Sequence, residues 1–96
     1  MNINIPERIQ NKIISMAKST GVERVVLFGS RARGTNSERS DIDLIVSGGD
    51  FDAFYWKIQE EMPSLLRFDV VNQDAVRTEA FKQEIARDGL VIYEKT

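Results

Sequence analysis

The spacing of apolar residues predicts a helix near the start of the chain. Four apolar side chains recur there at helical spacing: Ile9, Ile13, Met16 and Ala17. Pro6 suits the first position of a helix, and Gly21 is a suitable stop. We therefore expect a helix over Pro6–Ser19.

The next part of the chain changes from helical spacing to strand patterns. Val22–Phe28 is rich in β-branched and aromatic residues, as in an interior strand. Ser30–Gly34 is short enough for a single turn of helix, and the polar run Thr35–Ser40 is typical of a loop. Asp41–Val46 alternates between two faces, which predicts a second strand.

A second amphipathic helix is predicted after the turn at residues 47–49. Its apolar stripe is Phe51, Phe54, Tyr55, Ile58 and Met62. Pro63 is the expected stop, and Trp56 falls outside the stripe. The stripe indicates core packing, whereas Trp56 either covers the edge of the core or marks a partner surface.

The remaining sequence predicts a strand, a helix and a final strand. These are Leu66–Val71, Asp74–Asp88 with Gly89 at its end, and Leu90–Tyr93. The predicted order is therefore α-β-(short α)-β-α-β-α-β, with no internal repeat.

Composition narrows the chemistry that such a domain can perform. The 96 residues suit one domain over 1–96, and 42% hydrophobic with 29% charged residues is ordinary for a globular protein. There is no cysteine and no histidine, so disulfides, thiolate zinc sites and Ser-His or Cys-His nucleophiles are excluded. Any catalysis must rely on carboxylates, arginines, hydroxyls and bound metal.

Charge and hydropathy give expectations about location and partners. The net charge is −2, which argues against direct nucleic-acid binding, although a local basic patch stays open. The N-terminus lacks the basic and apolar regions of a signal peptide, and no apolar run is long enough to span a membrane. We expect a cytoplasmic protein without a membrane partner.

Two carboxylates on the second predicted strand indicate a metal site. Asp41 and Asp43 lie two residues apart, so they point to the same side with Cα atoms about 6.6 Å apart. They would repel one another unless a cation or an arginine compensates them. A hard divalent ion such as magnesium suits such oxygen ligands. Asp69, a charge within an otherwise apolar strand, is the best candidate for a third ligand.

A possible phosphate site precedes this carboxylate pair. Gly29 allows a ligand to approach the backbone, and Ser30 opens a helical turn whose N–H groups favour phosphate. Arginines follow closely and could offset the charge of a polyphosphate. The further candidates for nucleotide binding are Arg31, Arg33 and Ser40, with Arg39 completing the arginine cluster.

The stretch from Gly29 to Asp43 resembles the signature of the polymerase-β-like nucleotidyltransferase superfamily, in which Gly-Ser precedes Asp-x-Asp by ten residues. The small size and the ending Asp88–Tyr93 resemble its minimal nucleotidyltransferase (MNT) branch. Element order and resemblance together predict an α/β (α+β) fold with a mixed four-stranded sheet and helices mainly on one face.

The resemblance also implies site roles and partners. Gly29 and Ser30 would hold the triphosphate of ATP, Asp41 and Asp43 would bind two Mg²⁺ ions, and Asp69 would ligate the catalytic one. Members of the MNT branch are often encoded beside a HEPN-domain protein and act as its antitoxin, in some cases by adenylylating it. The expected activity is therefore transfer of AMP to a hydroxyl of a HEPN-type partner.

Simpler interpretations of these residues stay open. Asp41 and Asp43 could line a solvated strand, Ser30 could be an ordinary N-cap, and the arginines could form a solvated face. Asp69 could be a surface residue paired with Arg67. At the level of the whole chain, the alternatives are a non-catalytic module that neutralises a partner by contact and an antibiotic-modifying enzyme, which the short length disfavours. Base preference, the acceptor and homo-oligomer formation are left open.

Overall fold

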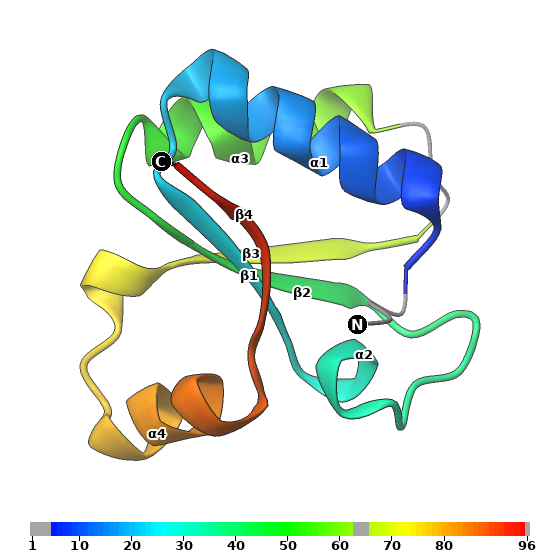
Figure 1. The fold of residues 1–96 in the computed structure, drawn as a ribbon, viewed down its shortest axis with the longest axis vertical. Coiled ribbons are helices and arrows are strands. Elements are labelled where there is room, and N and C mark those ends of the chain that lie inside the picture. Colours follow the sequence, from blue (N-terminus) through cyan, green and yellow to red (C-terminus); the bar gives the residue numbers. More distant parts are fainter. Residues whose placement is uncertain (1–4, 63–65, 96) are drawn as a thin grey trace.

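The computed structural model describes residues 5–62 and 66–95 and contains one four-stranded sheet with helices around it (Figure 1). The helices are α1 (Glu7–Thr20), α2 (Ser30–Arg33), α3 (Phe51–Glu61) and α4 (Glu79–Asp88), with a 3-10 turn η1 at Gln73–Ala75. The strands are β1 (Arg24–Phe28), β2 (Ile42–Ser47), β3 (Phe68–Asn72) and β4 (Leu90–Glu94).

The sheet is mixed and has the strand order β3-β2-β1-β4. β1 pairs antiparallel with both β2 and β4, whereas β2 and β3 run parallel. The parallel pair is joined through α3, because a parallel connection must cross back over the sheet. As a result, the N-terminal ends of β2 and β3 lie side by side at one end of the sheet.

The larger core lies between one face of the sheet and the helices α1 and α3, which lie side by side in Figure 1. Ile9 and Ile13 of α1 meet Phe54 and Ile58 of α3 there, all almost fully buried. Alternation along β2 directs Leu44 into the same core. Burial of these apolar side chains is the main stabilising contribution to the fold.

A smaller apolar cluster covers part of the opposite face. Val26 and Ile45 of the sheet are buried there together with Val76. α4 packs on this cluster through Phe81 and Ile85, and the Phe81 ring lies 5.6 Å from that of Phe28. The two longest helices thus share one face, as the sequence predicts, and the shorter α4 partly covers the other.

The predicted elements occur in the predicted order, with one correction. Gly21 ends α1 with φ 74°, as expected for a glycine stop. The prediction of one helix over Asp74–Asp88 was wrong, because an extended segment at residues 76–78 separates η1 from α4. Val76 is buried in the smaller cluster, so its side chain holds this segment against the sheet. The predicted helix stop Pro63 lies outside the described residues.

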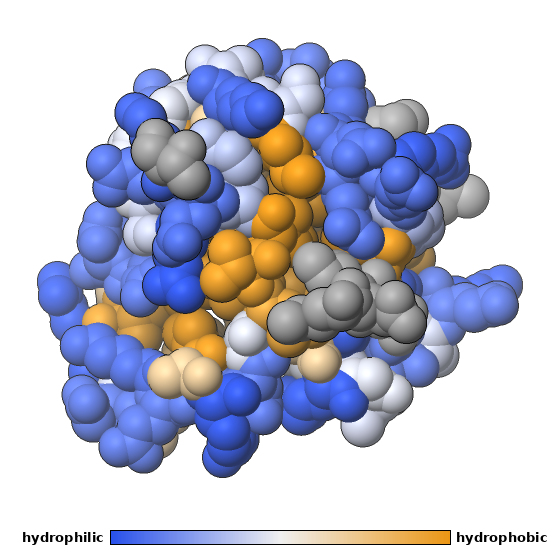
Figure 2. All heavy atoms as spheres, viewed as in Figure 1, coloured by the Kyte–Doolittle hydropathy of each residue, from blue (hydrophilic) through white to orange (hydrophobic). Residues whose placement is uncertain are grey.

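The surface of the molecule is polar over most of the view in Figure 2. Hydrophilic side chains lie on both sides of an apolar strip in the middle of this view, which runs from part of α1 down over β4. Val91 of β4 is 42% exposed. Among the described residues, no helix is long and apolar enough to cross a membrane.

Candidate active site

Asp43 and Asp69 lie directly opposite each other on neighbouring strands. The register of the parallel β2–β3 pair aligns these two residues, and side chains aligned in this way point to the same face of a sheet. That face is the one that α4 partly covers, because Asp43 alternates with the buried Leu44 and shares its side with Ile45. The sheet therefore brings together two carboxylates that are far apart in the sequence.

Asp41 lies just before β2, and it borders the same edge of the sheet. Together with Asp69 it lines a pocket of about 420 Å³, and both side chains are exposed to solvent. The other lining residues are Tyr55, Gln59, Arg67 and Phe68. The pocket thus lies between α3 and the start of β3, beside Asp41 and Asp69.

The electrostatics of Asp43 reflect its two acidic neighbours. Partial burial raises the pKa of its carboxyl, and the negative charges of Asp69 and Asp41 raise the pKa further. Arg33 and Arg31 act in the opposite direction but do not cancel these effects. Asp43 therefore interacts with both of the other carboxylates, and this repulsion favours either a proton or a bound cation at Asp43.

The turn before α2 is packed closely against Asp43. Phe28, the last residue of β1, pairs with Asp43. The turn that starts at Gly29 therefore lies next to the Asp43 side chain. Gly29 has φ 74°, and a Cβ atom added there would overlap the Asp43 carboxylate. Only glycine both adopts this positive φ without strain and leaves room for the Asp43 carboxylate. Ser30 is the first residue of α2, next to this turn.

Arg31 is buried and holds the loop that leads into β2. Its Nε donates to the carbonyl of Ser40 at 3.0 Å, and its guanidinium also donates to the carbonyl of Glu38 at 3.0 Å. Ser40 is fixed further, because its Oγ accepts from the N–H of Ser37 at 2.9 Å. Arg31 and Ser40 were predicted as nucleotide contacts, and the structure places both in the framework that positions Asp41.

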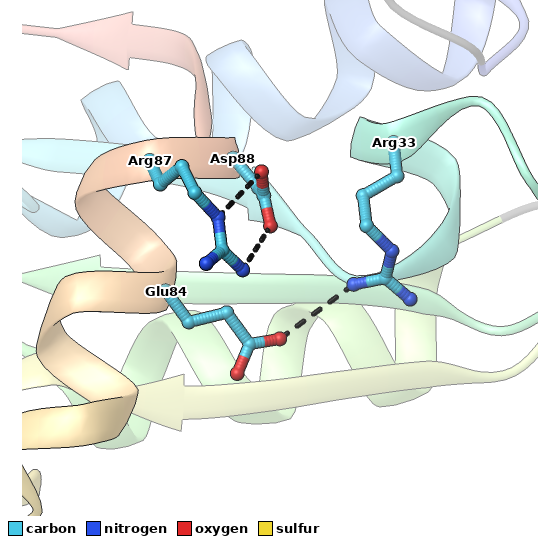
Figure 3. A network of polar contacts seen from close by, with 4 residues as sticks. All are labelled: Arg33, Glu84, Arg87 and Asp88. Carbon is cyan, nitrogen blue, oxygen red and sulfur yellow. Dashed lines mark hydrogen bonds and ion pairs between the residues drawn. The ribbon is translucent and has the colours of Figure 1, made fainter.

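Arg33 faces another direction from Arg31. Its Nη1 lies 3.6 Å from Oε1 of Glu84, so this ion pair links α2 to α4 (Figure 3). In the same figure Arg87 pairs with Asp88 at 3.0 Å, and the hydrogen bond from Arg87 lowers the pKa of Asp88. Exposed pairs of this kind stabilise a fold only weakly, so Arg33 can exchange Glu84 for another anion. Arg39 is exposed on the loop.

The carboxylates suit a divalent cation in their chemistry, and two of them are aligned on neighbouring strands. Oxygen ligands suit Mg²⁺, and the pKa of Asp43 is raised by its partial burial and by the charges of Asp69 and Asp41. Within residues 5–62 and 66–95, however, no three acidic side chains are gathered closely enough to hold a metal ion. Since like charges separate in the absence of a cation, the side chains would have to turn toward one another on binding.

Sequence reasoning missed two residues of the pocket, Tyr55 and Gln59. The amide of Gln59 donates to the carbonyl of Phe68 at 3.1 Å, which ties α3 to the start of β3. The two residues are four positions apart on α3, so the sequence indicates that they share a helix face. The sequence does not indicate that this face lies against the edge of β3.

Comparison with known proteins shows the family of the chain. A family model described as "Polymerase beta, Nucleotidyltransferase" matches residues 11–96. The chain therefore belongs to the polymerase β nucleotidyltransferase family, a class of enzymes that transfer nucleotidyl groups.

Two relatives come from Methanocaldococcus jannaschii. "Putative protein adenylyltransferase MJ0604" is 33% identical over 82 residues, which cover 75% of this chain and 79% of the relative. "Putative protein adenylyltransferase MJ0435" is 46% identical over 50 residues, and this match spans 52% of the chain and only half of the relative.

Solved structures share the fold at lower sequence identity. A toxin-antitoxin crystal structure with AMP-PNP superposes with a TM-score of 0.70 at 24% identity, covering 90% of this chain and 73% of that chain. The toxin-antitoxin MntA-HepT structure gives 0.65 at 20% identity, covering 94% and 74%. A nucleotidyltransferase-type structure from Sulfolobus solfataricus gives 0.52 at 16% identity, covering 92% and 82%.

Proposed function

We propose that this protein transfers AMP from ATP to a hydroxyl group of a partner protein, with Asp41, Asp43 and Asp69 as its catalytic carboxylates. The observation that carries the proposal is the alignment of Asp43 with Asp69 beside the Gly29 turn. The names of both M. jannaschii relatives support a protein as the acceptor.

In the proposed reaction each group has a defined task. The turn at Gly29 and Ser30 receives the triphosphate, and Arg33 adds positive charge after release from Glu84. The acceptor oxygen attacks the α-phosphorus, the bond to the β-phosphate oxygen breaks, and pyrophosphate leaves. Asp69 accepts the proton of the hydroxyl. Two Mg²⁺ ions held by the three carboxylates would lower the pKa of the hydroxyl and stabilise the leaving group.

A HEPN-type toxin is the proposed partner, which makes the chain an antitoxin. The similarity to toxin-antitoxin structures supports this proposal at the level of the fold. The acceptor would be a tyrosine, serine or threonine of the toxin, which reaches the carboxylates through the pocket lined by Asp41 and Asp69.

The second candidate function is neutralisation by contact alone. The 58% exposure of Trp56 favours this candidate. Both hypotheses predict an inhibited toxin, so inhibition by itself does not distinguish them.

Mass spectrometry of the toxin after incubation with ATP and Mg²⁺ separates the two functions. Transfer adds one AMP, and Asp43→Asn abolishes both the added mass and neutralisation, because it removes charge at nearly constant shape. If the toxin keeps its mass and is inhibited equally by the wild type and by Asp43→Asn, the enzymatic proposal is wrong.

A further inference from the structure

Trp56 is the most exposed large apolar side chain of the described residues, and it lies on α3 close to the candidate site. It is 58% exposed, although its neighbours Phe54 and Ile58 on the same helix are buried. An exposed tryptophan retains a large apolar area in contact with water and is frequent at protein interfaces. Packing in the core therefore does not explain why a tryptophan occupies this position on the solvent side of α3.

Two acidic residues flank Trp56 along one stripe of α3. Asp52, Trp56 and Glu60 are spaced four residues apart, so they share a helix face, and all three are exposed. Lys57 already pairs with Glu61 at 3.5 Å. Within the described parts of the chain, neither Asp52 nor Glu60 forms an ion pair. We call these three residues the α3 stripe.

The α3 stripe is continuous with the site pocket. The ring of Trp56 packs edge-on against that of Tyr55, with the ring centres 5.4 Å apart and an angle of 86° between their planes. Tyr55 in turn lines the pocket together with Asp41 and Asp69. A molecule seated on Trp56 would therefore border the pocket that Asp41 and Asp69 line.

We propose that the α3 stripe is the docking surface for the acceptor protein, and that it binds an arginine-bearing segment next to the hydroxyl to be modified. An arginine guanidinium stacks well on a tryptophan face and pairs with carboxylates in the same plane. Asp52 and Glu60 stand on either side of the ring to provide that pairing. The surface thus selects a basic partner segment, since an acidic one would be repelled.

This inference rests on the proposed function for the identity of its occupant, but its first test does not require catalysis. Trp56 is the sole tryptophan of the chain, so its fluorescence reports directly on binding at this surface. The probe is a synthetic tyrosine peptide that carries two arginines, and the matched peptide carries citrulline, the neutral analogue of arginine, at the same positions.

We expect saturable changes in Trp56 emission with the arginine peptide and at least about tenfold weaker binding of the citrulline peptide. Asp52→Asn and Glu60→Gln should each weaken the arginine peptide about threefold or more. Glu79→Gln on α4 removes the same charge away from the stripe and should leave the affinity unchanged. Equal binding of both peptides, equal weakening by Glu79→Gln, or no emission change would overturn the proposal.

A transfer assay with the same peptides distinguishes this proposal from the proposed function. If the α3 stripe positions the acceptor, Trp56→Ala raises the KM for the arginine peptide while kcat and the KM for ATP stay constant. Peptide binding at Trp56 without any AMP transfer to peptide or toxin would refute the enzymatic function and leave the docking surface standing. Transfer that is unaffected by Trp56→Ala would refute the docking surface alone.

Discussion

Asp43 and Asp69 face each other across the parallel strands β2 and β3, although the whole of α3 separates them in sequence. Replacement of either by asparagine should reduce the gain in ATP affinity that Mg²⁺ provides. Loss of a supporting group around a metal costs about 10- to 100-fold, so loss of a direct ligand should cost at least that much. Calorimetric titration of ATP with and without Mg²⁺ measures the effect. Equal ATP affinity of the wild type in both conditions would contradict a metal-dependent site.

Asp43→Asn should also stabilise the metal-free protein at neutral pH. The folded state raises the pKa of Asp43, so this residue favours folding most at low pH and loses that contribution as pH rises through the folded pKa. Asparagine does not ionise, so the variant does not lose stability in this way as the pH rises. In EDTA we therefore expect a higher Tm for the variant at pH 7, with the difference shrinking toward pH 3. A lower Tm of the variant at pH 7 would show that the carboxylate stabilises the metal-free fold.

Gly29→Ala should destabilise the protein and impair its site more than Gly34→Ala. Both glycines have positive φ, which costs a residue with a side chain about 1 to 2 kcal/mol. A Cβ at Gly29 would also displace the Asp43 carboxylate, whereas a Cβ at Gly34 meets nothing within 4 Å. Urea unfolding and Mg²⁺-dependent ATP binding measure the difference, and identical results for the two variants would exclude the close contact.

Arg31→Met should release the loop at residues 35–40. The variant loses the charged donors to the carbonyls of Ser40 and Glu38, at a cost of about 3 kcal/mol. Hydrogen exchange should accelerate at residues 35–41, and ATP binding should weaken through Asp41. Arg39→Met is the matched control, because Arg39 is exposed on the same loop. Faster exchange in the control than in Arg31→Met would contradict the positioning role of Arg31.

The sequence predicted the order of the elements and the position of the carboxylates better than the roles of the arginines. Helical and alternating patterns are local, so they identified α1, β2 and α3 directly. The burial of Arg31 was not readable, since two arginines on one helical turn look alike until the loop folds over one of them. The break before α4 was missed because the burial of Val76 depends on the distant Val26 and Ile45.

The crossover connection between β2 and β3 also affects how the protein folds. The antiparallel β1–β2 pair needs only a loop to close, whereas β3 can align with β2 only after α3 has packed across the sheet. The repulsion between Asp43 and Asp69 appears only when β3 aligns with β2. Strand β3 should therefore pair with β2 more slowly than β1 does, and Mg²⁺ should accelerate its docking if the ion binds as the strands come together.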